Sequence, residues 1–282
     1  MTVPVNFSEL GLCDELSQAV ADLGYKEPTP IQEKSIPYVL MGRDILGSAQ
    51  TGTGKTASFT LPMIEILASG RAKARLPRSL ILAPTRELAA QVADSFEKFS
   101  TYHKLSMALL IGGVSFADQN VALSKGVDVL IATPGRLLDH FERGKVLLTD
   151  VKVLVIDEAD RMLDMGFIPD VERIVGLLPP LRQTLFFSAT LSDDIKKLSD
   201  KFVSNPKVIE VAPPASTADT VAQHLVWTSP KGKRAALRDL LLTPLGRIPP
   251  GPGIQARLVA GLVGDPLGTL GLAMPDFERL AS

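Results

Sequence analysis

Short apolar runs alternate with helix-like patterns over most of this chain, and this alternation constrains the fold more than any other feature. The runs lie between about Arg43 and Val211 and are almost continuous in Val, Ile, Leu and Phe. Strands of that kind are buried on both faces, as in a parallel sheet. Strands separated by helices predict an α/β doubly wound domain. The runs are DILGSA, SLILAPT, SMALLIGG, DVLIATP, VLVIDEA, TLFFSAT and KVIEV.

Helical patterns fill the segments between these runs, including 55–67, 86–99, 135–142 and 193–201. Near the N-terminus, leucines at helical spacing predict one amphipathic helix from Ser8 that ends at Gly24. A second helix is expected over about 30–41. In folds of this class, functional residues gather at the carboxyl ends of the strands.

Composition limits the classes of protein that this chain can belong to. Its 282 residues are 45% hydrophobic and carry a net charge of -1, so the chain has no overall basic field and would bind nucleic acid through a local surface. The single cysteine, Cys13, cannot form an internal disulfide and is expected to be a small apolar residue near a helix start. No leader or membrane-spanning run is evident. These features predict a cytoplasmic protein.

The segment SAQTGTGKTASF follows a predicted strand and opens a helix, as a phosphate-binding loop does. Its glycines would let backbone amides face phosphate oxygens, Lys55 would reach the β and γ phosphates, and the Thr56 hydroxyl would bind Mg²⁺. The strict pattern begins with glycine, where this sequence has alanine. By itself the segment predicts an ATP or GTP site, the alternative being a glycine-rich turn. The predicted nucleotide-binding residues are Ala49, Gly52, Thr53, Gly54, Lys55 and Thr56.

The segment VLVIDEADRML supplies the acids that such a loop needs. Asp157 would hold Mg²⁺, and Glu158 would orient and deprotonate the attacking water. Acids that merely cap the following helix are the alternative for an isolated pair. The phosphate loop about a hundred residues earlier favours the metal site.

Seven short motifs, taken in order along the chain, resemble those of the DEAD-box RNA helicases. They are GYKEPTPIQ (24–32), AQTGTGKT (49–56), PTREL (84–88), GG (112–113), TPGR (133–136), DEAD (157–160) and SAT (188–190). The resemblance covers about residues 5–242. It implies a RecA-like P-loop NTPase lobe that takes ATP with Mg²⁺ and hydrolyses it while unwinding RNA.

The resemblance also implies roles for residues outside the phosphate loop. Gln32 would recognise the adenine edge, and Phe7 would pack on the base. The hydroxyls of Ser188 and Thr190 would bond Asp160 and link the nucleotide site to domain movement.

Three of the motifs have the small residues, hydroxyls and arginines suited to holding a sugar–phosphate backbone without reading bases. Contacts to 2′-hydroxyls could favour RNA over DNA. The predicted RNA-binding residues are Pro84, Thr85, Arg86, Gly113, Thr133, Pro134, Gly135 and Arg136. RNA is thus the expected partner, with other RNA-processing proteins as further candidates and no membrane.

Beyond residue 211 the pattern changes. We expect an N-terminal helix with the adenine motif at 1–32, the RecA-like lobe at 33–211, a linker at 212–220 and the start of a second lobe at 221–242. Residues 243–282 lack lysine and are rich in Gly and Pro, which predicts a poorly structured tail. Our hypothesis is that a disrupted reading frame after about Leu242 replaced the second lobe.

Two functions follow from these observations. The first is an ATP-dependent RNA helicase, and the second is an isolated ATP- and RNA-binding lobe without unwinding activity. The second is the alternative because the sequence has no HRxGRxGR-like segment, which in the family completes the hydrolytic site. A missing arginine of that kind can lower the rate by about 10³–10⁵, so little RNA-stimulated hydrolysis is expected of this chain by itself. A P-loop ATPase that acts on DNA or protein would leave Gln32 unexplained.

Overall fold

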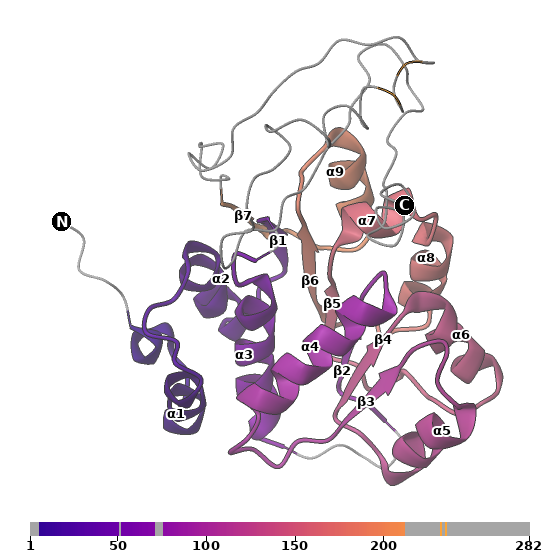
Figure 1. Ribbon diagram of the computed structural model, residues 1–282, viewed down its shortest axis with the longest axis horizontal. Coiled ribbons are helices and arrows are strands. Elements are labelled where there is room, and N and C mark those ends of the chain that lie inside the picture. The colour runs from indigo at the N-terminus through magenta and orange to yellow at the C-terminus, as the bar shows by residue number, and fades with distance from the viewer. Residues whose placement is uncertain (1–5, 51, 71–75, 212–231, 233–234, 236–282) are drawn as a thin grey trace. The chain divides into compact units, whose positions relative to one another are not determined.

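The computed structural model describes residues 6–50, 52–70, 76–211, 232 and 235 (Figure 1). The described sheet lies in a compact unit of residues 1–215, and only Gly232 and Ala235 are described in the unit formed by 216–282. The predicted linker and tail therefore lie outside the described residues, as does nearly all of the predicted second-lobe start.

Seven strands form one sheet in the order β3-β4-β2-β5-β6-β1-β7, and all neighbouring strands are parallel. The predicted α/β fold is therefore confirmed. The strands are β1 Ile45–Ser48, β2 Ser79–Leu82, β3 Met107–Leu110, β4 Val129–Ala132, β5 Val153–Ile156, β6 Gln183–Ser188 and β7 Lys207–Glu210.

The helices follow the predicted segments closely at several positions. The predicted bounds 86–99 are those of α4, and α3 begins at Lys55 as expected. The helices are α1 Asp14–Asp22, α2 Pro30–Leu40, α3 Lys55–Ala68, α4 Arg86–Phe99, α5 Phe116–Lys125, α6 Pro134–Glu142, α7 Ala159–Asp164, α8 Ile168–Gly176 and α9 Asp193–Ser199, with a 3₁₀ helix η1 at Phe7–Leu10.

The single N-terminal helix expected from Ser8 is wrong. The chain instead forms η1, turns at Gly11 with φ 85°, and begins α1 at Asp14. A left-handed residue ends a helix, and glycine adopts that conformation without a steric penalty. The regularly spaced leucines Leu10, Leu12 and Leu16 are nevertheless buried, so the apolar pattern correctly identified the residues that enter the core.

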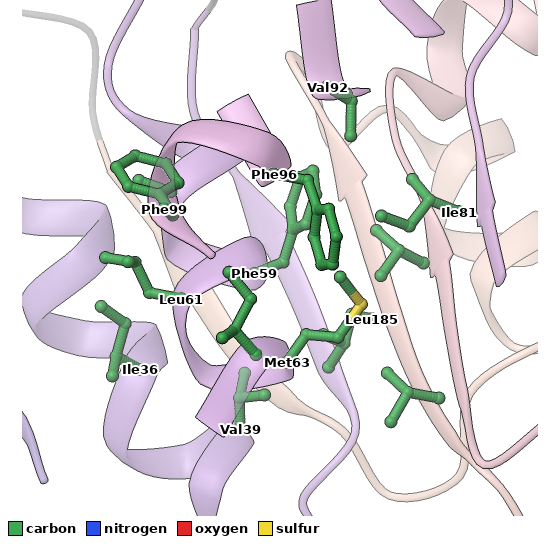
Figure 2. Close-up of a cluster of buried hydrophobic side chains, with 14 of the residues drawn as sticks. Ile36, Val39, Phe59, Leu61, Met63, Ile81, Val92, Phe96, Phe99 and Leu185 are labelled. Carbon is green, nitrogen blue, oxygen red and sulfur yellow. The ribbon is translucent and has the colours of Figure 1, made fainter. Parts of the chain in front are cut away.

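Two apolar clusters, one on each face of the sheet, form the core. Alternate residues of a strand enter different clusters: Ile45 belongs to the cluster that includes residues of α2, α3 and α4, whereas Leu46 belongs to the one that includes residues of α6, α8 and α9. Phe59 of α3 and Phe96 of α4 lie in the first cluster (Figure 2). Burial on both faces explains why the strand sequences are continuously apolar.

Gly47 in β1 has no space for a side chain. A Cβ at this position would lie 2.6 Å from two ring atoms of Phe187, which is itself fully buried. We expect Gly47→Ala to lower the free energy of unfolding by about 1–3 kcal/mol, as overpacking of a core does. Urea unfolding measures this change. Gly176→Ala is the matched control because nothing lies near its Cβ; a loss at Gly47 no larger than that at Gly176 would contradict the prediction.

Cys13 is half-buried before the start of α1. Its Sγ lies 3.6 Å from His103 Nε2, and its backbone N–H donates to Glu65 Oε2 at 2.8 Å. Burial and the neighbouring Glu65 carboxylate raise the pKa of the Cys13 thiol to about 11. The thiol is therefore protonated near neutral pH and has little nucleophilic character.

Among the described helices, none is long and apolar enough to cross a membrane.

Candidate functional site

The sheet order divides the sequence motifs into two groups of neighbouring strands. The phosphate loop, the DEAD segment and the SAT segment follow β1, β5 and β6, which are adjacent to one another. The PTREL, GG and TPGR segments follow β2, β3 and β4, which are also adjacent. All of the strands are parallel, so both groups lie along the carboxyl edge of the sheet, where ligands bind in such folds (Figure 1).

Backbone hydrogen bonds continue past the strand ends and align the motifs. Ala49 donates its N–H to the Ser188 carbonyl at 3.2 Å, and Asp157 donates to the Leu82 carbonyl at 3.0 Å. These bonds bring the first residues of the phosphate loop and the DEAD segment into line with neighbouring strands.

The phosphate loop presents a buried cation. Gly52 and Gly54 have φ values of 84° and 90°, a backbone form that favours glycine. Lys55 opens α3 and is only 6% exposed, and its Nζ has no hydrogen-bond partner within the described part of the chain. An unpaired ammonium costs free energy when it is buried, unless an anionic ligand binds it. Thr56 follows it in the first turn of α3, whereas Thr51 lies outside the described residues.

Gln32 holds the phosphate loop from the neighbouring helix α2. Its side chain is 1% exposed; Oε1 accepts from the Thr29 N–H at 2.9 Å, and Nε2 donates to the Gly54 carbonyl at 3.1 Å. A Cβ on Gly54 would overlap this amide. Both ends of the Gln32 amide are thus bonded to the chain, and its contact with adenine stays a prediction.

Phe7 is 6% exposed and belongs to the apolar cluster beside α2 and α3. Its packing on adenine also stays a prediction.

The two acids differ in burial and backbone form. Asp157 is 6% exposed, and burial raises the pKa of its carboxyl to about 6 although the Lys55 ammonium opposes this rise. Glu158 has φ 52°, which strains a non-glycine residue, and its N–H donates to Asp157 Oδ1 at 3.0 Å. Arg161 Nη1 lies 3.6 Å from Glu158 Oε2. Backbone strain, as at Glu158, and a shifted pKa, as at Asp157, are each common at functional sites.

The predicted bonds from the Ser188 and Thr190 hydroxyls to Asp160 are not those observed among the described residues. The backbone N–H of Ala189 donates to Asp160 Oδ2 at 3.1 Å instead, and Ser188 Oγ accepts from the Thr190 N–H at 3.3 Å. The amide just beyond β6 has no strand partner, and the Asp160 carboxylate satisfies it. Side-chain type could not identify Ala189 as the donor, because every residue except proline has a backbone N–H.

The second motif group forms one connected surface. Arg86 is exposed and its guanidinium lies against Gly112 and Gly113, where a Cβ on Gly112 would be 3.1 Å from Arg86 Nη2. Gly113 has φ 79°, so a side chain there would be strained as well as crowded. Thr85 caps α4 by accepting the Leu88 N–H at 3.3 Å. The PTREL arginine, Arg86, can therefore keep this position only because the GG motif has no side chains there.

The TPGR segment begins α6. Thr133 is the N-cap residue, Pro134 is the buried first residue of the helix, and Gly135 is exposed. Arg136 is half-buried: its Nε donates to Gln119 Oε1 at 2.9 Å and its Nη2 to the Val114 carbonyl at 2.5 Å. Arg136 therefore also organises the loop that follows β3.

The donor set suits a magnesium–nucleotide complex better than a bare metal ion. No group of three or more His, Cys, Asp or Glu side chains that could hold a metal ion occurs in the described ranges. Mg²⁺ is commonly bound through one or two protein oxygens together with water and substrate phosphates. The Asp157 carboxylate and the Thr56 hydroxyl fit this requirement, with Lys55 beside them for the phosphates.

The parallel sheet and the phosphate loop at the end of β1 define a RecA-like P-loop NTPase domain. The family model for the DEAD/DEAH box helicases matches residues 29–198, more than half of the chain. The chain belongs to the DEAD/DEAH box helicase family.

Individual relatives agree with this assignment. The chain is 44% identical over 242 residues to the ATP-dependent RNA helicase RhlB of Pseudomonas putida, covering 83% of this chain and 61% of that protein. It is 40% identical to the DEAD-box ATP-dependent RNA helicase CshA of Geobacillus kaustophilus, of which it covers 50%. The crystal structure of a DEAD box protein from Methanococcus jannaschii aligns with a TM-score of 0.69 at 38% identity, over 86% of this chain and 64% of that one. The chain thus spans between half and two thirds of these relatives.

Proposed function

We propose that this chain is an ATP-dependent RNA helicase and that residues 6–211 provide its ATP- and RNA-binding lobe. The observation that supports this proposal is the sheet order: the phosphate loop and the DEAD and SAT segments follow three adjacent strands, and the three segments predicted to bind the RNA backbone follow the next three. An RNA strand that crosses the ends of β3, β4 and β2 would lead directly to the acids after β5.

The nucleotide site would work through charge and position. Lys55 would neutralise phosphate oxygens, the amides of the phosphate loop would surround them, and Asp157 and Thr56 would hold Mg²⁺. When bound, the cation would offset the negative charge of the phosphates. Glu158 would accept the proton of the attacking water. Gln32 would recognise adenine. Its bond to Gly54 would couple adenine binding to the conformation of the phosphate loop.

The RNA site would contact the sugar–phosphate backbone. Arg86 and Arg136 supply positive charge, and Thr85, Gly113 and Thr133 offer hydroxyl or amide donors beside Pro134 and Gly135. Contacts of this type position a strand without reading its sequence. We further propose that the bond from Ala189 to Asp160 couples the nucleotide site to movement of the SAT segment, with Ser188 fixing Thr190. A cytoplasmic location stays a prediction.

Glu158→Gln tests this function. With the protein in excess over ATP and with single-stranded RNA present, even slow hydrolysis can be followed in a single turnover. We expect the variant to hydrolyse ATP at least 100-fold more slowly, as loss of a general base does, while ATP affinity changes less than threefold. The exposed Glu97→Gln on α4 is the matched control.

Two results would count against the proposed function. The first is a wild-type protein that binds neither Mg²⁺–ATP nor single-stranded RNA. The second is a hydrolysis rate that RNA does not alter and that Glu158→Gln does not lower, because contaminating ATPase would then explain the activity.

A further inference from the structure

The side chain of Gln119 connects three elements beside the backbone-binding surface. Gln119 lies on α5 and is 4% exposed. Its Oε1 accepts from Arg136 Nε at 2.9 Å and lies 2.7 Å from His140 Nε2, and its Nε2 donates to the Ile111 carbonyl at 2.8 Å. One amide thus joins the TPGR arginine, the body of α6 and the loop that follows β3.

Chemistry fixes the orientation of this amide. Arg136 Nε can only donate, so the atom facing it must be the Gln119 oxygen. The same oxygen faces His140, whose Nε2 must then carry a hydrogen. His140 is fully buried, and burial followed by the charge of Arg136 lowers its pKa, which favours the neutral ring. Gln119 therefore accepts two hydrogen bonds that a residue without a side-chain acceptor cannot replace.

Phe116 provides a second constraint on the same arginine. The Cζ atom of Arg136 lies 3.3 Å from the ring centroid of Phe116, and that of Arg143 lies 4.0 Å from it. Two guanidinium groups cannot share one face at those distances, so the ring separates them. Cations are attracted to aromatic faces, so the ring can hold two positive charges near one another.

We propose that Gln119 and Phe116 are positioning residues that hold Arg136 ready for an RNA phosphate. The inference rests on the proposed function. An unconstrained arginine loses side-chain entropy when it binds, and a fixed one has already lost much of it. The guanidinium has five N–H donors, and its bonds to other described residues use Nε and one hydrogen of Nη2, so donors remain for a phosphate.

The network also holds the loop that carries the glycine pair. Gln119 binds the Ile111 carbonyl and Arg136 binds the Val114 carbonyl, and Gly112 and Gly113 lie between these two residues. Loss of Gln119 would release both Arg136 and this loop. It would leave the phosphate loop, which follows a different group of strands, with its contacts intact.

Gln119→Leu removes the acceptor and the donor but retains an apolar side chain of similar length. We expect the affinity of the full chain for a fluorescent single-stranded oligouridine to fall about five- to tenfold, with ATP affinity unchanged. The slope of log affinity against log salt should decrease by about 0.7, which corresponds to one lost phosphate contact on a single strand. A purely structural role would not change this slope. The exposed Gln18→Leu on α1 is the matched control and should bind RNA as the wild type does.

A double-mutant cycle with Arg136→Met separates the possible outcomes. If Gln119 acts mainly through the arginine, the loss of RNA affinity in the double variant should be clearly smaller than the sum of the two single losses. Additive losses, or an unchanged salt slope in Gln119→Leu, would overturn the positioning role while the proposed function stands. If Arg136→Met itself binds RNA normally, the arginine's place in the RNA site fails and the positioning role fails with it.

Thermal unfolding and ATP binding would reveal whether Gln119→Leu folds. If it does not, Phe116→Leu tests the positioning role instead. Phe116 is only half-buried, so its truncation should be tolerated. We expect RNA affinity two- to threefold below that of the wild type and a smaller salt slope. Unchanged affinity in this variant would overturn the proposal.

Discussion

Lys55→Met is expected to weaken binding of Mg²⁺–ATP by at least 100-fold while the fold is retained. The Lys55 ammonium is almost fully buried and has no hydrogen-bond partner among the residues that the structure describes. In the proposed complex it would make charge-assisted bonds to phosphate, each contributing about 1.5–3 kcal/mol. Methionine keeps most of the apolar stem and removes only the charge. Titration with a fluorescent ATP analogue measures the affinity.

The same substitution at an exposed lysine provides the control. Lys125→Met lies on α5 and should bind the nucleotide with wild-type affinity. The free energy of unfolding of Lys55→Met without nucleotide should equal or exceed that of the wild type, because an unpaired buried charge has been removed. Nucleotide affinity within threefold of the wild type would show that Lys55 does not bind phosphate.

Asp157→Asn is expected to stabilise the nucleotide-free protein at pH 7.5, by about 3 kcal/mol at most. Burial raises the Asp157 pKa from 3.8 to about 6 in the folded chain, so the folded state disfavours the carboxylate. Each unit of pKa shift corresponds to about 1.4 kcal/mol. Asparagine keeps the shape and removes the charge. Urea unfolding at several pH values measures the difference.

The sign of the pH dependence follows from the direction of the shift. Below about pH 4 the carboxyl is protonated in the folded and unfolded chain alike, so wild type and variant should be equally stable. Between about pH 4 and 6 the unfolded chain loses this proton first, and the wild type loses stability as the pH rises. Above about pH 6 the difference should be constant.

A control variant and added nucleotide distinguish the effect of the buried Asp157 charge from a general effect of replacing Asp by Asn. The exposed Asp164→Asn at the end of α7 should change stability by less than about 0.5 kcal/mol. With Mg²⁺ and ATP present, the advantage of Asp157→Asn should disappear, because the carboxylate that destabilises the nucleotide-free protein would hold the cation. A difference between Asp157→Asn and wild type that does not vary with pH would contradict the prediction.

Local sequence patterns predicted the start of a helix well where a single residue, such as a glycine turn or an N-cap, sets that start. The start of α3 at Lys55 follows from the glycine turn before it, and the start of α4 at Arg86 follows from Thr85 at the N-cap. The pattern failed near Gly11, where regular leucine spacing continued through a break in the helix. Periodicity reports which residues are buried, and a short turn can preserve it while the backbone changes direction.

Site residues were predictable only where the side chain itself carries the chemistry. Lys55, Asp157 and Glu158 could be proposed from their types and spacing, whereas the SAT motif pointed to the hydroxyls of Ser188 and Thr190 and not to the backbone N–H of Ala189 that bonds Asp160. Gln119 was missed for a related reason. Its partners Ile111, Arg136 and His140 are 8, 17 and 21 residues away and come together only when α5 and α6 pack.

The sequence by itself determined the alternation of strands and helices, the burial of the strands and the family motifs, because these depend on residue type and near neighbours. Only the tertiary structure decided that β1, β5 and β6 are adjacent and that β2, β3 and β4 form the other group. Strand order depends on how helices cover the two faces of the sheet, a long-range packing effect that no local pattern encodes. That order brings motifs more than a hundred residues apart to one edge of the sheet.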